Sequence, residues 1–350
     1  MRLNFFFITK ISIYFIFSHF IIINVSLLTA SDKGIFVKKT DKINLSAYKM
    51  KHALIIGINN YKYNSIPDLS YSENDAVEIS KILKEIYDFE HVTTLIGKKA
   101  TKDNIIDQIA DLSDPTKVSK EDAVLIYFSG HGVTVDTASG EQGYLLPVDA
   151  KVSIKDVKNP APFRRHAIRM DDLRVDSDAI LARHVLFLID ACYSGYFSTK
   201  AVIQKAEISN ALKYNARQVI TAGTKNEEAL EDNTWKHGIF TYKLLEYLRN
   251  ENEPIAATAL GAWLKKTVPR EVSNRLPNYS LTPQVKYLSG DGDFYFIRKD
   301  YLFNINDNNK FIKAKQDMNI IRKIIEAQLI LKELEHDMKI QEVKKLLFIK

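Results

Sequence analysis

The chain has 350 residues, of which 46% are hydrophobic, so it is long enough for one large domain with additional segments at its ends. Charged residues make up 26% of the chain, and both signs are spread along it, with a formal net charge of +6. No block of basic residues with interleaved aromatics occurs, so the composition argues against a nucleic-acid partner.

The first thirty residues differ from the rest of the chain. Arg2 and Lys10 precede a run at 11–29 that is almost entirely apolar and ends beside a small residue suited to cleavage. That order is typical of a secretory signal, and we expect a periplasmic or secreted protein. The apolar run is also nearly long enough to span a bilayer, so an uncleaved membrane anchor is the alternative. Residues 31–48 are expected to form a polar tether.

Residues 49–299 alternate between patterns of buried strands and amphipathic helices, as expected of one folded domain. We expect strands at 52–58, 91–96, 122–128, 185–189, 217–223 and 293–297. Helices are expected after Glu73 and at 102–112, 170–181, 238–248 and 255–268, the last ended by Pro269. Polar or irregular loops are expected at 134–142, 151–168 and 196–214, with a short extended piece at 144–147. Strands that alternate with helices predict an α/β fold with a mostly parallel sheet covered on both faces.

A candidate general base follows the strand expected at 122–128. The strand breaks into Ser129-Gly130-His131-Gly132, and the two glycines let the backbone turn sharply and approach a bound substrate closely. Of the eight histidines, His131 alone lies in such a loop at the end of a buried strand. A histidine here could activate a neighbouring nucleophile and later protonate a leaving amine.

A candidate nucleophile follows the strand expected at 185–189. The strand ends in Asp190-Ala191-Cys192, which delivers the single cysteine of the chain to the carboxyl edge of a parallel sheet, where α/β folds bind ligands. A lone cysteine could also be a small buried hydrophobic residue. In an exported protein, however, an unpaired thiol invites oxidation, which favours a chemical role for Cys192.

The two loops together resemble the catalytic core of caspase-like cysteine peptidases. Residues 127–132 (Tyr-Phe-Ser-Gly-His-Gly) and 190–195 (Asp-Ala-Cys-Tyr-Ser-Gly) are most similar to metacaspases and their bacterial relatives, whereas animal caspases carry Gln-Ala-Cys at the nucleophile. Cys192 lies 61 positions after His131, close to the roughly fifty typical of the family. The resemblance runs from about Met50 to Arg298. It implies a caspase-like three-layer sandwich with a sheet of about six strands.

The resemblance also implies an activity and the residues that carry it. Cys192 would attack the scissile carbonyl of a peptide, and His131 would act first as base and then as acid. Backbone N–H groups of Gly132 and Cys192 would form the oxyanion hole. No third side chain is assigned to orient His131, because the family works largely with a dyad.

Specificity is expected to depend on acidic residues. By the resemblance, Asp190, Asp75 and Ser129 line the specificity pocket. Two unpaired carboxylates in one pocket repel each other, and a bound guanidinium or ammonium relieves that repulsion. We therefore expect protein or peptide substrates with arginine or lysine before the cut bond. Without the resemblance, Asp75 is an ordinary acid at a helix N-terminus.

No cofactor is expected. Several metacaspases are activated by calcium through an acidic cluster, and Asp171 and Asp172 match part of it. The loop after His131 and the segment after Cys192 lack the remaining acids, so calcium dependence is not favoured. The chain also has no phosphate-binding glycine loop and no paired Cys/His metal motif.

The last segment, 300–350, is predicted to contain one long amphipathic helix. Its apolar residues recur at alternating steps of four and three, from Ile320 to Met338. Such a stripe could dock on the peptidase domain or mediate self-association. A different class of function also remains open, namely a non-catalytic caspase-like module that binds partners through its fold and this helix. A thiol redox sensor is least favoured, because there is no resolving cysteine.

Overall fold

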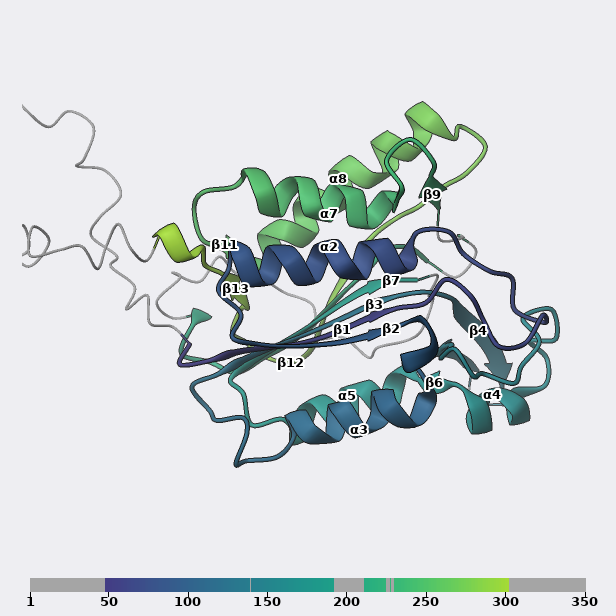
Figure 1. The fold of residues 1–350 in the computed structure, drawn as a ribbon, viewed down its shortest axis with the longest axis horizontal. Coiled ribbons are helices and arrows are strands. Elements are labelled where there is room, and N and C mark those ends of the chain that lie inside the picture. Colours follow the sequence, from purple (N-terminus) through teal and green to yellow (C-terminus); the bar gives the residue numbers. More distant parts are fainter. Residues whose placement is uncertain (1–47, 139, 192–210, 225–226, 228–229, 302–350) are drawn as a thin grey trace, which may run out of the picture.

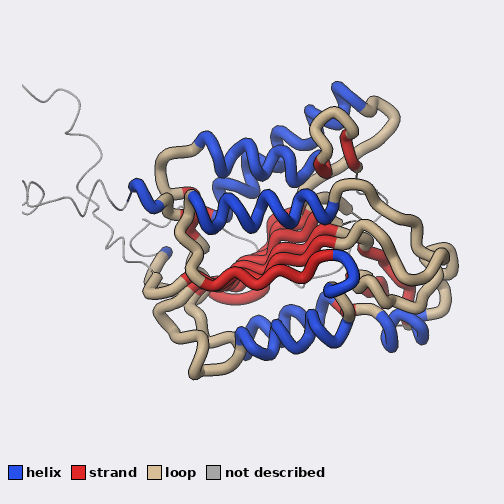
Figure 2. The backbone as a smooth tube through the Cα atoms, viewed as in Figure 1, coloured by secondary structure: helices blue, strands red, loops and turns tan. Residues whose placement is uncertain are grey.

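The computed structural model describes residues 48–138, 140–191, 211–224, 227 and 230–301. Its centre is a six-stranded sheet with helices on both faces (Figures 1 and 2). In sheet order the strands are β12 (Gln284–Gly290), β8 (Ala216–Thr221), β7 (His184–Asp190), β3 (Ala123–Ser129), β1 (Lys51–Gly57) and β2 (His91–Ile96). Only β12 runs antiparallel to its neighbour within this sheet. The predicted α/β sandwich with a mostly parallel sheet is confirmed.

The four central strands are completely buried, and β1, β3 and β7 each contain a continuous apolar run. Every residue of β1, β3, β7 and β8 is buried. Runs of this kind form strands covered on both faces, because side chains alternate between the two sides of a sheet. The edge strand β2 is mostly exposed.

In the part of the chain that the structure describes, helices cover both faces of the sheet (Figure 1). On the first face lie α2 (Ser72–Glu85), α7 (Ile239–Asn250) and α8 (Ala257–Arg275). On the second lie α3 (Lys102–Leu112) and α5 (Met170–Ala179). As predicted, α3 begins after Thr101, whose hydroxyl accepts the backbone N–H of Asn104 at 3.3 Å.

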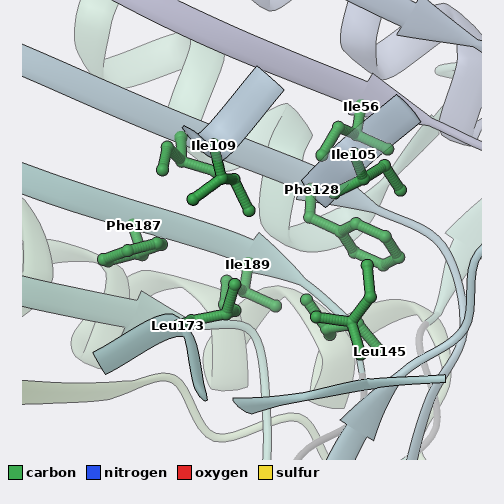
Figure 3. Close-up of a pocket in the computed structure, with 10 residues that line it drawn as sticks. Ile56, Ile105, Ile109, Phe128, Leu145, Leu173, Phe187 and Ile189 are labelled. Carbon is green, nitrogen blue, oxygen red and sulfur yellow. The ribbon is translucent and has the colours of Figure 1, made fainter. Parts of the chain in front are cut away.

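A small apolar void lies between the sheet and this second face (Figure 3). Its volume is about 10 Å³, and its lining includes Ile105 of α3, Phe128 of β3 and Phe187 of β7. A void of this size barely holds one water, and its lining offers that water no polar partner. We therefore treat it as a packing defect of the core and not as a ligand site.

Short strands complete the fold. They are β4 (Gly132–Thr137), β5 (Gly140–Leu145) and β6 (Ile168–Arg169); β9 (Glu231–Asp232) and β10 (His237–Gly238); and β11 (Ile255–Ala256) and β13 (Tyr295–Phe296). A 3₁₀ turn, η1 (Gly97–Lys99), follows β2, and the helix α4 (Pro160–His166) precedes β6.

Two of the expected loops contain regular structure. Residues 134–142 belong largely to the hairpin of β4 and β5, which turns near Gly140 at a φ of 109°, a conformation that favours glycine. The segment 151–168 contains α4, which begins because Asn159 accepts the N–H of Ala161 and a proline occupies its first turn. Burial of Phe163 then holds α4 on the domain.

Two other expectations about secondary structure are wrong. The sixth strand of the main sheet is β12, whereas 293–297 contributes only β13 to a separate two-stranded sheet. The helix expected at 255–268 does not end at Pro269 but continues to Arg275. Buried Val268 and Val272 hold α8 across the proline, at the cost of one backbone hydrogen bond.

The predicted signal or anchor at 1–30 lies outside the described residues, as does the predicted helix of 300–350 apart from its first two residues. Within the part of the chain that is described, no helix combines the length and the apolar character needed to cross a membrane.

Candidate active site

The strand register brings the two predicted loops to one edge of the sheet. In the parallel pair β3–β7, Ser129 lies opposite Asp190, and each is the last residue of its strand. The backbone N–H of Gly130 donates to the carbonyl of Asp190 at 3.3 Å, which joins the two loops where they leave the sheet. His131 and Cys192 each follow two residues later. Cys192 itself lies outside the described residues.

His131 is held by the loop between β1 and α2. Its backbone N–H donates to the Tyr61 hydroxyl at 2.8 Å. Its Nε2 lies 2.9 Å from the carbonyl oxygen of Pro67, which can only accept, so Nε2 carries a hydrogen. In the neutral ring, Nδ1 is then the nitrogen that can accept a proton.

Gly130 is required by the close approach of Tyr61. A Cβ at this position would lie 2.9 Å from the Tyr61 hydroxyl and 3.1 Å from the Phe128 ring. Burial raises the pKa of Tyr61 well above its ordinary value, so the hydroxyl stays protonated. Gly132, the predicted oxyanion donor, is the first residue of β4.

The predicted specificity residues Asp75 and Asp190 lie close together around Gly238. A Cβ at Gly238 would lie 2.7 Å from Oδ2 of Asp190 and 3.1 Å from Oδ2 of Asp75. Both side chains are buried, and we call them the acidic pair. Asp75 comes from the first turn of α2 and Asp190 from the end of β7, so the fold unites residues far apart in sequence.

The third predicted specificity residue, Ser129, is also buried near Asp190. Its neighbour Tyr127 shares a hydrogen bond of 2.6 Å with the Thr241 hydroxyl. Thr241 in turn donates its hydroxyl and its backbone N–H to Oδ2 of Asp190, at 2.5 and 3.3 Å. The start of α7 therefore fixes one carboxylate oxygen of Asp190.

Burial makes ionisation of the acidic pair costly. It raises the pKa of Asp190 to about 7, and the nearby charge of Asp75 acts in the same direction. It raises the pKa of Asp75 to about 6, although hydrogen bonds from His237 and Gly238 counteract part of this effect. A positive group between the two carboxylates would relieve both effects.

Two polar residues of this region, Glu231 and His237, were not predicted. Glu231 of β9 accepts the backbone N–H groups of Ser70 and Tyr71, which precede α2. His237 of β10 places Nδ1 2.6 Å from Oδ1 of Asp75. Neither residue lies in a motif or a periodic pattern, and both depend on where the β9–β10 hairpin packs.

The described residues contain no group of three His, Cys, Asp or Glu side chains arranged to hold a metal ion. Asp172, one of the two acids matched to the calcium cluster, pairs instead with Arg169 at 2.6 Å.

A mostly parallel sheet between two helical layers, with a histidine loop at its carboxyl edge, defines the caspase-like fold. The chain belongs to the caspase-domain family of cysteine peptidases, because the family model described as "Caspase domain" matches residues 50–295. Comparison with curated proteins gives no significant match.

Solved structures similar to this chain include the following two. A protein from Geobacter sulfurreducens is 19% identical, with a TM-score of 0.48 over 68% of this chain and 93% of its own. Caspase-1 from Spodoptera frugiperda is 15% identical, with a TM-score of 0.48 over 69% of this chain and 88% of its own.

Proposed function

We propose that the chain is a cysteine endopeptidase of metacaspase type that cleaves peptide bonds after arginine or lysine. The observation that carries the specificity is the acidic pair, because two buried carboxylates lie close together around Gly238. One of them, Asp190, is at the carboxyl edge of the sheet, where β3 leads into His131. Membership of the cysteine peptidase family supports the chemistry.

The reaction would follow the ordinary course of thiol peptidases. The Cys192 thiol gives its proton to Nδ1 of His131, and the sulfur attacks the carbonyl carbon of the substrate. The tetrahedral oxyanion is stabilised by backbone N–H donors, for which we propose Gly132 and Cys192. His131 then protonates the leaving amine, and water hydrolyses the thioester with His131 as base.

The Pro67 carbonyl suits this role of His131. By accepting from Nε2, it keeps Nδ1 as the basic nitrogen and stabilises the imidazolium that forms after proton transfer. A backbone oxygen thus does what an acidic side chain does in a Ser-His-Asp triad.

The acidic pair accounts for the choice of substrate. An aspartate or glutamate side chain there would add a further negative charge to two buried carboxylates, whereas an arginine or lysine offsets the charges present. We propose no metal requirement, so a chelator should leave the activity unchanged. We also propose that residues 1–30 direct export or anchoring, which rests on their sequence alone.

Profiling the purified full chain on a peptide library tests the function. We expect cleavage after arginine and lysine, its loss in Cys192→Ala and in His131→Ala, and a large loss in Asp190→Asn. Asp107→Asn, an exposed acid of α3, is the matched control and should behave as wild type. Preference for aspartate before the cut bond would refute the specificity. A folded chain that cleaves no peptide would favour the alternative of a binding module.

A further inference from the structure

His237 is the basic residue that contacts the acidic pair. Its Nδ1 lies 2.6 Å from Oδ1 of Asp75, and the two side chains are 12% and 1% exposed. Oδ2 of Asp75 accepts the backbone N–H of Gly238 at 3.1 Å. Among the residues that the structure describes, no lysine or arginine forms an ion pair with Asp75 or Asp190.

Two basic residues stand near this contact: Lys236 precedes His237 in the chain, and Arg275 pairs with Asp232, the residue opposite His237 in the β9–β10 hairpin. The other groups that face the contact are acidic or neutral. Asp190 faces it from β7, and the charge of Glu231 on β9 acts on both acids of the pair. Asn74 of α2 places its amide 3.4 Å from Nδ1, and the Tyr242 ring of α7 lies 6.5 Å from the imidazole. Tyr127 of β3 reaches the pair through Thr241 and stays protonated, because burial raises its pKa well above the ordinary value.

We propose that His237 and Asp75 hold a proton while the site is empty, and that a basic substrate side chain displaces this proton. The inference rests on the proposed function and identifies His237 as a specificity-determining residue. No covalent bond changes: the substrate cation enters, and one proton leaves for the solvent. The empty site thereby avoids two uncompensated buried carboxylates, which are costly in a protein interior.

Two consequences follow from this exchange. An imidazolium and a substrate cation beside the same carboxylates repel each other, so the two compete for the site. Linkage then requires binding to weaken as the pH falls, by up to about tenfold in Kd per pH unit for one displaced proton. Asp190 can release a proton on binding as well. The contribution of His237 to proton release is therefore measured as the decrease that follows removal of its imidazole.

Calorimetry on the full chain carrying Cys192→Ala tests the proposal. The probe is a capped peptide that ends in arginine, and the same peptide with citrulline is its neutral control. Titration near neutral pH in two buffers with different ionisation enthalpies gives the number of protons released on binding. We expect release with arginine, none with citrulline, and a decrease of up to one proton in His237→Gln. His91→Gln, at the exposed amino end of β2, should match the parent.

The outcomes separate the inference from the proposed function. Equal proton release with and without His237→Gln overturns the role of His237, even if the arginine peptide binds tightly. Failure of the arginine peptide to bind better than the citrulline peptide refutes the acidic pair as the specificity site, and the inference falls with it. If His237→Gln does not fold, His237→Asn serves in its place. A Kd of the parent that does not change with pH also overturns the proposal.

Discussion

At the scale of single residues, the histidine of the site is held by a backbone carbonyl and a tyrosine hydroxyl. Pro67 supplies a carbonyl oxygen to Nε2 of His131, and Tyr61 supplies a hydroxyl to its backbone N–H. A sequence motif cannot reveal a contact to a backbone carbonyl, because every residue has one. The hydroxyl of Tyr61 is the part that mutation can remove.

Replacing Tyr61 by phenylalanine should lower kcat while leaving KM nearly unchanged. The substitution leaves the N–H of His131 without its acceptor and loosens the loop that carries the base. Loss of such a buried partner costs about 1–3 kcal/mol, so we expect kcat to fall by roughly tenfold or more. Steady-state kinetics on an arginine peptide measures both constants. Tyr279→Phe, at a residue 52% exposed, is the control, and an equal effect there would contradict the assignment.

The acidic pair also predicts how stability depends on pH. Burial raises the pKa of Asp190 from its ordinary value of 3.8 to about 7. Between these values the folded state holds more protons than the unfolded chain, so the contribution of Asp190 to stability decreases as the pH rises and is constant above about pH 7. Ionisation of Asp190 therefore opposes folding in the absence of a bound cation.

We accordingly expect Asp190→Asn to become more stable relative to wild type as the pH increases from about 4 to about 7. The upper limit of this change is on the order of a few kcal/mol. Denaturant unfolding of both proteins across this range gives the difference in the free energy of unfolding, in which titrating groups that do not interact with Asp190 cancel. A difference that stays constant, or changes in the opposite direction, would show that Asp190 ionises freely in the folded protein.

At the scale of elements, a hairpin built from two-residue strands carries Glu231, His237 and Gly238. Two packing contacts explain why so short an element is ordered. Trp235 in its turn stacks on Tyr242 of α7 at 3.7 Å, and the Arg275 guanidinium of α8 lies 3.7 Å above the same indole. Glu231 then joins the hairpin to the start of α2.

The sequence after Cys192 predicts self-processing after one of three lysines, Lys200, Lys205 or Lys213. Of these we expect cleavage after Lys200 or Lys205, and not after Lys213. The backbone around Lys213 is held on both sides: the carbonyl of Ala211 accepts the N–H of Asp293, and that of Tyr214 accepts Nε2 of His184. A peptidase needs an extended, accessible backbone, and these hydrogen bonds hold the backbone around Lys213 on the domain. Arg217 is excluded as well, because it is buried within β8.

Incubation of wild type beside Cys192→Ala, followed by mass spectrometry of the new amino termini, locates the cuts. A cut after Lys213 in wild type alone would contradict the argument from backbone contacts. Cuts in both proteins would indicate a contaminating protease, and intact chains in both would show that self-processing does not occur.

The sequence correctly predicts those strands whose apolar pattern is strong enough to determine their structure locally. The buried strands β1, β3 and β7 contain continuous apolar runs; His131 follows the end of β3, and Asp190 of the nucleophile motif is the last residue of β7. By contrast, β12 is half-exposed at the sheet edge, so its pattern is weak. His237 acquires its role only through the packing of α7 and α8 on the hairpin, which no local pattern encodes.

At the scale of the whole molecule, the two ends of the described domain lie side by side, at the opposite edge of the sheet from the site. The hydroxyl of Tyr48 accepts the N–H of Tyr295 at 2.9 Å and contacts His184, the first residue of β7. Tyr301 packs with Tyr48 against one small cluster. In Figure 1 both ends of the described domain lie at the left, whereas the parallel strands β1, β2, β3 and β7 point to the right.

Removal of 302–350 should therefore leave catalysis on short peptides intact. Tyr301 packs on a cluster at the amino edge of the strands, whereas His131 follows the carboxyl end of β3, and the described residues already form extensive apolar clusters on both faces of the sheet. We expect kcat/KM on an arginine peptide to stay within about twofold, because truncation effects follow the burial and hydrogen bonding of what is removed. Light scattering on both proteins shows whether the tail mediates self-association. A gain of about tenfold or more in kcat/KM would mean that the tail blocks the site, and loss of cooperative unfolding would mean that it belongs to the core.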